Sequence, residues 1–111
     1  MKLAIVGSRN LSVENIDEYI PKEMEIDEII SGGARGIDAC AKSFALENSF
    51  VYTEILPDYK RYSRAAPIIR NREIVERADH VLIFWNGVSR GTKSVIDYCK
   101  SIGKSFSVFE V

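Results

Sequence analysis

Residues that build metal sites are scarce in this chain, which has two cysteines, one histidine and no CxxC or HExxH motif. Zinc and related metals need several such ligands at close spacing, so the sequence predicts no metal site. A single histidine also excludes Ser-His-Asp and Cys-His catalytic sets unless His80 is a member. His80 begins an apolar run typical of a strand, so we expect a structural role at the sheet edge opposite any ligand site.

Long hydrophobic runs are also missing. No stretch approaches the roughly 20 apolar residues that span a bilayer, so we expect no membrane segment. No signal peptide is recognisable, and Cys40 and Cys99 fall within predicted helices among apolar neighbours. Free cysteines pack as small hydrophobes, so we expect buried, reduced thiols in a cytoplasmic protein. No repeat, linker or low-complexity tract interrupts residues 1–111, for which we expect a single domain.

The chain carries little net charge. Its formal net charge of -1 argues against general electrostatic attraction to nucleic acid or to an anionic membrane. The distribution is uneven, because residues 10–30 hold seven acids against one base, whereas residues 58–93 hold eight bases against four acids. An anionic ligand for the basic region is therefore consistent with the composition.

Short apolar runs alternate with stretches of helical periodicity along the whole chain. The runs predict strands, and apolar residues three or four positions apart predict helices. Such alternation is typical of a three-layer α/β/α fold, here with a mostly parallel five-stranded sheet. We expect strands over 3–6, 27–31, 50–56, 80–85 and 106–111, helices over 13–20 (capped by Ser12), 37–48, 67–78 and 92–102, and a loop over 57–66.

The segment from Ile29 to Asp38 is the most informative. An apolar run stops at Ser31, and Gly-Gly-Ala-Arg-Gly follows before a helical pattern begins. Glycines allow a sharp turn with no Cβ in the way of a ligand, and free N–H groups at a helix start attract phosphates. Turn glycines without a ligand are the alternative, and Arg35 is either a phosphate contact or a solvated side chain. For Asp38, stabilisation of the helix dipole is favoured over catalysis.

Loops rich in glycine, hydroxyl or arginine groups follow the expected strands, at 7–10, 31–36, 57–66 and 85–92. Ligands of open parallel sheets bind beyond the carboxyl ends of the strands, so these loops are predicted to converge on one phosphate site. Gly91-Thr92-Lys93-Ser94 lacks the spacing of a P-loop, and Thr92 is either a helix N-cap or a phosphate ligand.

For each of four further side chains, the sequence is consistent with two roles. Trp85 either covers the core or presents a face to a nucleotide base. Arg70 and Asn71 are exposed helix residues unless the start of their helix faces the ligand. Tyr59 lies among charged residues in a stretch that suits either a nucleotide-facing loop or a solvated one.

The block Ser31-Gly32-Gly33-Ala34-Arg35-Gly36-Ile37-Asp38 resembles the motif of the SLOG superfamily, which includes the DNA-processing protein DprA (Smf) and the LOG phosphoribohydrolases. Gly7-Ser8-Arg9, Arg70-Asn71, Phe84-Trp85-Asn86-Gly87 and Ser89-Arg90-Gly91-Thr92 are similar to its small YspA-like branch. The resemblance implies a Rossmann-like fold, self-association and a nucleotide-derived ligand such as NAD, ADP-ribose or AMP, which the protein senses or processes. By position, the implied binding residues are Gly7, Ser8, Arg9, Gly32, Gly33, Ala34, Arg35, Gly36, Gly91 and Thr92.

We therefore predict a module that binds a phosphate-bearing nucleotide. Arg9 and Arg35 would neutralise phosphate charge, and Trp85 or Tyr59 would stack on the base. Single-stranded DNA binding through the basic loops, as in DprA, is an alternative, although the net charge makes nucleic acid the less favoured partner.

Cleavage of the N-glycosidic bond of a nucleotide is the other alternative, and it needs a carboxylate near the ribose. The LOG enzymes carry a catalytic glutamate three residues after the motif threonine, where this chain has Val95. The candidates that would have to replace it are Asp38, Asp58 and Asp97.

Overall fold

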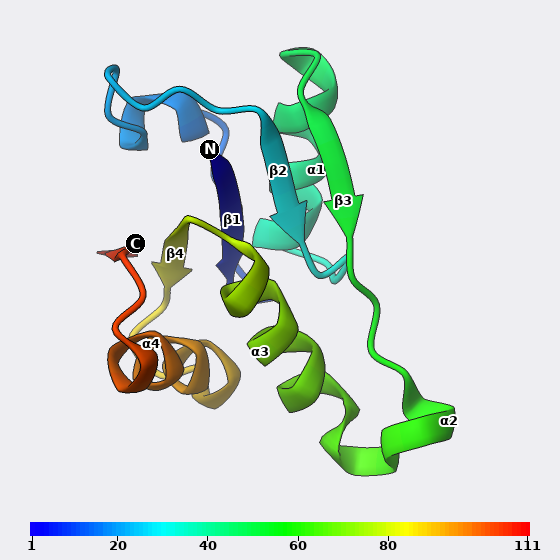
Figure 1. The fold of residues 1–111 in the computed structure, drawn as a ribbon. Coiled ribbons are helices and arrows are strands. Elements are labelled where there is room, and N and C mark those ends of the chain that lie inside the picture. Colours follow the sequence, from blue (N-terminus) through cyan, green and yellow to red (C-terminus); the bar gives the residue numbers. More distant parts are fainter.

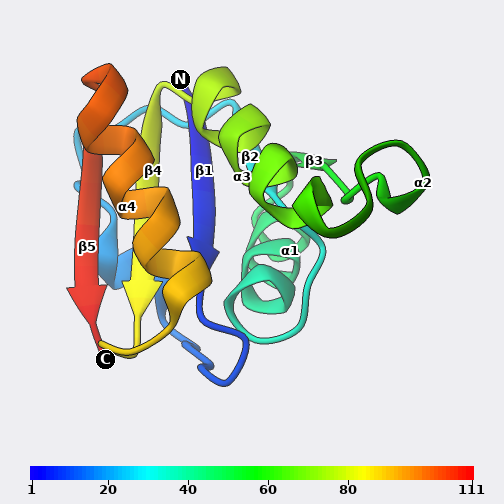
Figure 2. The same ribbon diagram turned by 90° about the horizontal axis from the view of Figure 1, so that it is seen from below.

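A five-stranded, wholly parallel sheet forms the centre of the protein, and the computed structural model describes all residues 1–111. The strands lie in the order β3-β2-β1-β4-β5 (Figures 1 and 2). They are β1 (Lys2–Gly7), β2 (Glu28–Ser31), β3 (Val51–Glu54), β4 (His80–Trp85) and β5 (Phe106–Glu110). The helices are α1 (Ile37–Glu47), α2 (Tyr59–Tyr62), α3 (Ala66–Arg77) and α4 (Arg90–Ile102), with 3₁₀ turns η1 (Ile16–Tyr19) and η2 (Ser63–Ala65). The predicted Rossmann-like α/β fold is confirmed.

Helices cover both faces of the sheet, and each face has its own core. Figure 2 shows α3 and α4 side by side on one face, where Val6 and Ile83 pack beneath them. α1 and η1 cover the opposite face, where Leu3, Ile5 and Phe84 are buried. β1 and β4 contribute to both cores because successive side chains of a strand point to opposite faces. Their nearly continuous apolar sequences follow from this central position.

The predicted helix over 13–20 is wrong, because only the 3₁₀ turn η1 forms between β1 and β2. Ile20 already has extended backbone. The Ser12 hydroxyl does not cap a helix and lies 3.6 Å from the Cys40 sulfur. Val13 and Ile16 are buried on the α1 face of the sheet. Their three-residue spacing thus reflects shared burial, which a single 3₁₀ turn satisfies as well as an α-helix does.

The predicted loop over 57–66 is wrong in part, because most of it forms α2 and η2. The Asp58 carboxylate accepts a hydrogen bond from the Arg61 N–H at 3.1 Å and so starts α2. α4 begins two residues earlier than predicted, because Ser89 is its N-cap and Thr92 is not. Pro67 stands in the first turn of α3, as predicted.

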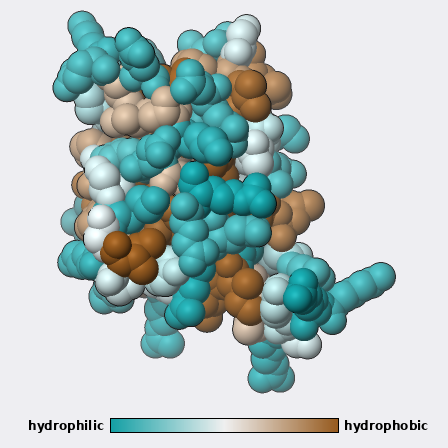
Figure 3. Space-filling model, in the orientation of Figure 1, coloured by the Kyte–Doolittle hydropathy of each residue, from teal (hydrophilic) through white to brown (hydrophobic).

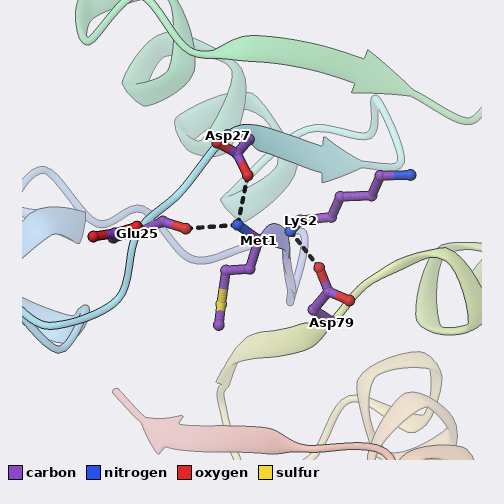
Figure 4. A network of polar contacts seen from close by, with 5 residues as sticks. All are labelled: Met1, Lys2, Glu25, Asp27 and Asp79. Carbon is purple, nitrogen blue, oxygen red and sulfur yellow. Dashed lines mark hydrogen bonds and ion pairs between the residues drawn. The ribbon is translucent and has the colours of Figure 1, made fainter.

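Polar groups at the amino edge of the sheet pair with one another. The Met1 ammonium donates to the Glu25 carbonyl at 2.6 Å and to the Asp27 carboxylate at 2.7 Å (Figure 4). The Lys2 N–H donates to the Asp79 carboxylate at 2.7 Å, and the Asp79 N–H donates back to the Lys2 carbonyl at 2.8 Å. These contacts tie the start of β1 to the segments that precede β2 and β4.

His80 lies at this same edge, at the start of β4, as predicted. Its Nδ1 is 2.7 Å from the Ser105 hydroxyl, and its Nε2 is 2.9 Å from the Ser107 hydroxyl. Burial lowers the pKa of His80 below its ordinary value. Both ring nitrogens are occupied by protein groups, which is the environment of a structural histidine.

The two cysteines lie on opposite faces of the sheet. Cys99 is fully buried in the core beneath α3 and α4, whereas Cys40 is half-buried against the core on the α1 face. Both thiols are free. None of the helices combines the length and the apolar character that crossing a bilayer requires.

Candidate functional site

A cavity of about 370 Å³ lies at the carboxyl edge of the sheet, between the loops that follow β1 and β4. The chain turns from β1 toward β2 and β3, then crosses back to β4 on the other side of β1. The loops after β1 and β4 therefore diverge, and parallel sheets bind ligands at such a reversal of strand order. The residues that line the cavity are Val6, Gly7, Ser8, Arg9, Asn10, Ala34, Asp38, Pro67, Arg70, Asn71, Asn86, Ser89, Gly91, Thr92 and Val95.

Three hydroxyl groups form a chain of hydrogen bonds beside this cavity. Ser8 Oγ lies 3.3 Å from Thr92 Oγ1, which donates to Ser89 Oγ at 3.1 Å. Since Thr92 donates its only hydroxyl proton to Ser89, Ser8 must be the donor to Thr92. Ser89 Oγ also accepts from the Thr92 N–H at 3.3 Å. The Ser89 hydroxyl proton thus has no protein acceptor and remains available to a ligand.

The first turn of α4 adds backbone donors. Helix geometry gives its first N–H groups no acceptor within the helix, and those of Arg90 and Gly91 have no other protein partner. They lie at the positive end of the helix dipole. Gly91 lines the cavity, and a Cβ built on it meets no protein atom within 4 Å. The backbone at Gly91 is therefore open to a ligand.

A buried arginine and a buried carboxylate meet on the other side of the cavity. Arg70, 8 % exposed, donates from Nη1 to the Gly32 carbonyl at 2.7 Å and from Nε to Asn71 Oδ1 at 2.8 Å. Asp38, 6 % exposed, accepts from the Ala34 N–H at 3.1 Å. Burial raises the pKa of Asp38, and the Ala34 N–H and the charge of Arg70 oppose that rise. A Cβ on Gly32 would lie 2.7 Å from Arg70 Nη1 and 2.9 Å from Asp38 Oδ2, so this arrangement requires glycine.

A second cavity, of about 300 Å³, adjoins the first. Arg9, Ala34 and Arg70 line both cavities. The second is completed by residues that follow β2 and β3, namely Gly32, Gly33, Arg35, Leu56 and Pro57. The loops after β1, β2 and β4 thus converge on one edge as predicted, and the residues just after β3 join them through the second cavity.

Several predicted site residues lie elsewhere. Trp85 lines neither cavity, because its Nε1 donates to the Ser89 carbonyl at 3.0 Å and its ring packs against the core on the α3 and α4 face. Gly36 also lines neither, and its close approach to the Arg9 carbonyl joins the first two loops instead. Tyr59 is exposed on α2.

The three candidate catalytic carboxylates lie in different places relative to the cavities. Asp38 lines the main cavity. Asp58 caps α2 and lies outside both carboxyl-edge cavities. Asp97 pairs with Lys93 at 3.0 Å on an exposed face of α4. Val95, at the position of the LOG glutamate, lines the main cavity, so that position faces the ligand space without a carboxylate.

Sequence reasoning did not predict six of the lining residues as ligand contacts, namely Val6, Asn10, Pro67, Asn86, Ser89 and Val95. Asn86 holds its loop, since its Oδ1 accepts from the Val88 and Ser89 N–H groups at 2.9 and 2.8 Å. An Asn whose side chain accepts from the N–H two residues further on is a recognisable signal for such a turn. Pro67 carries no local signal, because only the tertiary path of the chain brings the start of α3 to the cavity.

Comparison with known families gives one match. The model of the family described as DNA recombination-mediator protein A matches residues 1–58, from β1 through β3 and into the following loop. The matched part, which includes the loops after β1 and β2, supplies nearly half of the residues that line the main cavity and all but Arg70 of those that line the second. No curated protein and no solved structure matches the chain.

Proposed function

The chain belongs to the DNA recombination-mediator protein A family, and from this premise we propose that its main cavity binds the phosphate of a nucleotide-derived ligand such as AMP, ADP-ribose or NAD. The observation that carries the proposal is the convergence of uncommitted donors on one cavity. Ser89 with its free hydroxyl proton, Gly91 with its free N–H group and Arg70 with its guanidinium all line this cavity. Together they complement a phosphate in hydrogen bonding and in charge.

Binding without turnover is favoured over N-glycosidic cleavage. Stabilising an oxocarbenium-like centre needs a carboxylate at the ribose, and Val95 occupies the position of the LOG glutamate. Asp38 is the only carboxylate of the main cavity, and the Ala34 N–H and the nearby Arg70 charge already engage it. Incubating the protein with AMP is expected to release no adenine. Adenine release that disappears in Asp38→Asn would favour the enzyme instead.

Thermal shift and calorimetry with AMP, ADP-ribose and NAD test the binding proposal, since a ligand of the native state raises its stability. The informative variant is Gly91→Val, because Gly91 lines the cavity and a Cβ there lies more than 4 Å from every atom outside its chain neighbours and its own helix backbone. It is expected to abolish binding and to leave the melting temperature of the free protein nearly unchanged. Ser94→Val, in the same helix but outside both cavities, is the matched control and should bind normally. Equal binding by the two variants would contradict the proposal.

Single-stranded DNA is the second candidate, and the arm formed by α2 and η2 supports it. Figures 1 and 2 show α2 projecting away from the sheet, and in Figure 3 this part of the surface is largely hydrophilic. Tyr59, Lys60 and Arg61 are exposed there, and the Arg61 guanidinium lies 5.2 Å from the centre of the Tyr62 ring. Cations beside exposed aromatic rings suit stacking on unpaired bases.

A gel-shift titration with a single-stranded oligonucleotide at low and high salt tests this second candidate. Tyr59→Ala with Arg61→Ala should weaken binding, whereas Gly91→Val should not. A loss caused only by Gly91→Val would instead assign DNA to the main cavity. No shift at low salt would remove DNA as a ligand.

A further inference from the structure

The two cavities of the carboxyl edge form one depression with unbalanced charge. Arg9 and Arg70 line both parts, and Arg35 lines the second. Asp38 is the only acidic residue that lines either. The depression therefore presents three guanidinium groups against one carboxylate.

No ion pair neutralises these positive charges. The ion pairs of the protein include none of Arg9, Arg35 and Arg70. Burial lowers the pKa of Arg70, and the neighbouring charge of Arg9 lowers it further, whereas Asp38 opposes both. Like charges held together at a cavity repel each other, and a bound anion would relieve that repulsion.

Two of the three guanidinium nitrogens of Arg70 donate hydrogen bonds to protein groups, and the third does not. Arg70 donates to protein groups from Nε and Nη1 only. Every fully buried side-chain nitrogen or oxygen in the structure has a hydrogen-bond partner, so Nη2, which has none, is not fully buried. Arg70 lines both cavities and also a third one beside Glu73 and Glu76, and its accessible Nη2 supplies a free donor at their junction.

We propose that this depression holds two phosphate groups of one ligand. The first lies against the start of α4 and the Ser89 hydroxyl, and the second lies among Arg9, Arg35 and Arg70. This inference rests on the proposed function, which covers ligands with one phosphate and with two, and narrows it to ligands with two. The cavities, of about 370 and 300 Å³, each have the size of a small ligand site, and they share a wall that contacts both phosphates.

Isothermal titration calorimetry with three adenosine phosphates tests the inference. AMP has one phosphate, ADP has two adjacent ones, and adenosine 3′,5′-bisphosphate carries them on either side of the ribose. The second phosphate is expected to tighten binding about tenfold, as one additional charge-assisted contact would. Whichever of ADP and adenosine 3′,5′-bisphosphate binds more tightly reveals the spacing of the two phosphate sites, and the 3′,5′ arrangement is also the one found along a nucleic-acid strand.

Two variants that each remove one positive charge show whether the second phosphate is held by a specific contact or only by the net charge of the protein. Arg35→Ala should abolish the gain in affinity that the second phosphate brings. Lys42→Ala, on an exposed position of α1 outside both cavities, should preserve the gain. Arg35 is exposed and forms no ion pair, so its removal should not unfold the protein.

The outcomes that contradict the inference differ from those that contradict the proposed function. Equal affinity for AMP, ADP and adenosine 3′,5′-bisphosphate overturns the inference and leaves nucleotide binding intact. Equal losses in Arg35→Ala and Lys42→Ala also overturn it, because the gain would then come from net charge alone. Failure of all three compounds to bind overturns the proposed function, and the inference with it.

Discussion

The two edges of the sheet differ in how their polar groups are satisfied. At the amino edge, Met1, Lys2, Asp79 and His80 form hydrogen bonds with protein groups. At the carboxyl edge, the Gly91 N–H, the Ser89 hydroxyl proton and the guanidinium groups of Arg9, Arg35 and Arg70 line the two cavities with donors that have no protein acceptor. No fully buried side-chain nitrogen or oxygen lacks a partner, so the free side-chain donors are accessible from solvent and can be completed by a ligand. Substitutions at the two edges should therefore affect different properties.

The largest expected effect is the loss of stability in Gly36→Ala. Gly36 has φ +77° and ψ -127°, a conformation open to glycine, and a Cβ would overlap the Arg9 and Ser8 carbonyls. Strain and steric overlap together should lower the free energy of unfolding by about 3 kcal/mol. Chemical denaturation measures this change.

Gly91→Ala is the control for Gly36→Ala, because its Cβ meets open space. Alanine favours the helix over glycine, so stability should rise by up to about 1 kcal/mol. We therefore assign Gly36 to the support of the loops and Gly91 to contact with the ligand. Similar destabilisation by the two variants would contradict this assignment.

The second effect concerns affinity. Arg70→Met should weaken adenosine phosphate binding about 30-fold, which corresponds to about 2 kcal/mol for a lost charge-assisted contact. Calorimetry gives the dissociation constant, and denaturation gives the separate cost of losing the bond to the Gly32 carbonyl. Arg72→Met is the matched control, because Arg72 lies on the same helix with its guanidinium 5.1 Å from the centre of the Tyr98 ring. Equal losses of affinity in the two variants would remove Arg70 from the site.

Much of the difference between the two edges of the sheet could be predicted from local sequence patterns. Apolar runs and helical periodicity predict the strands, their parallel arrangement and the side on which the loops after β1, β2 and β4 emerge. The position of His80 at the start of a run places it at the amino edge. The glycines around Arg35 predict a tight turn because their conformation is a local property.

The remaining parts depend on tertiary structure. Arg70 reaches Gly32 only because α3 crosses back over the sheet, and no local pattern encodes that contact across 38 positions. Trp85 could not be assigned either, since its role depends on whether the next loop folds back to accept its N–H. The apolar spacing over 13–20 led to a wrong helix prediction. Such spacing indicates that the residues are buried on one side, and it does not distinguish a 3₁₀ turn from an α-helix.

A smaller effect is expected at the amino edge. Asp79→Ala removes the acceptor of the Lys2 N–H and should lower the free energy of unfolding by about 1 kcal/mol, without changing affinity for any adenosine phosphate. Denaturation and calorimetry on the same variant measure the two quantities. Asp97→Ala, which breaks an exposed ion pair with Lys93, should cost less than Asp79→Ala. A change of affinity in Asp79→Ala would show that the two edges are coupled.

The smallest expected effect is the titration of His80. Burial lowers its pKa in the folded protein, so His80 binds its proton less readily there than in the unfolded chain, whose value is 6.5. The stability that it contributes is therefore complete above pH 6.5 and is lost as the pH falls through the folded pKa. Because the chain has one histidine, a single imidazole resonance in an NMR titration reports its midpoint. That midpoint should lie below 6.5 and stay unchanged when an adenosine phosphate is added, whereas a shift on ligand addition would mean that the amino edge also responds to the site.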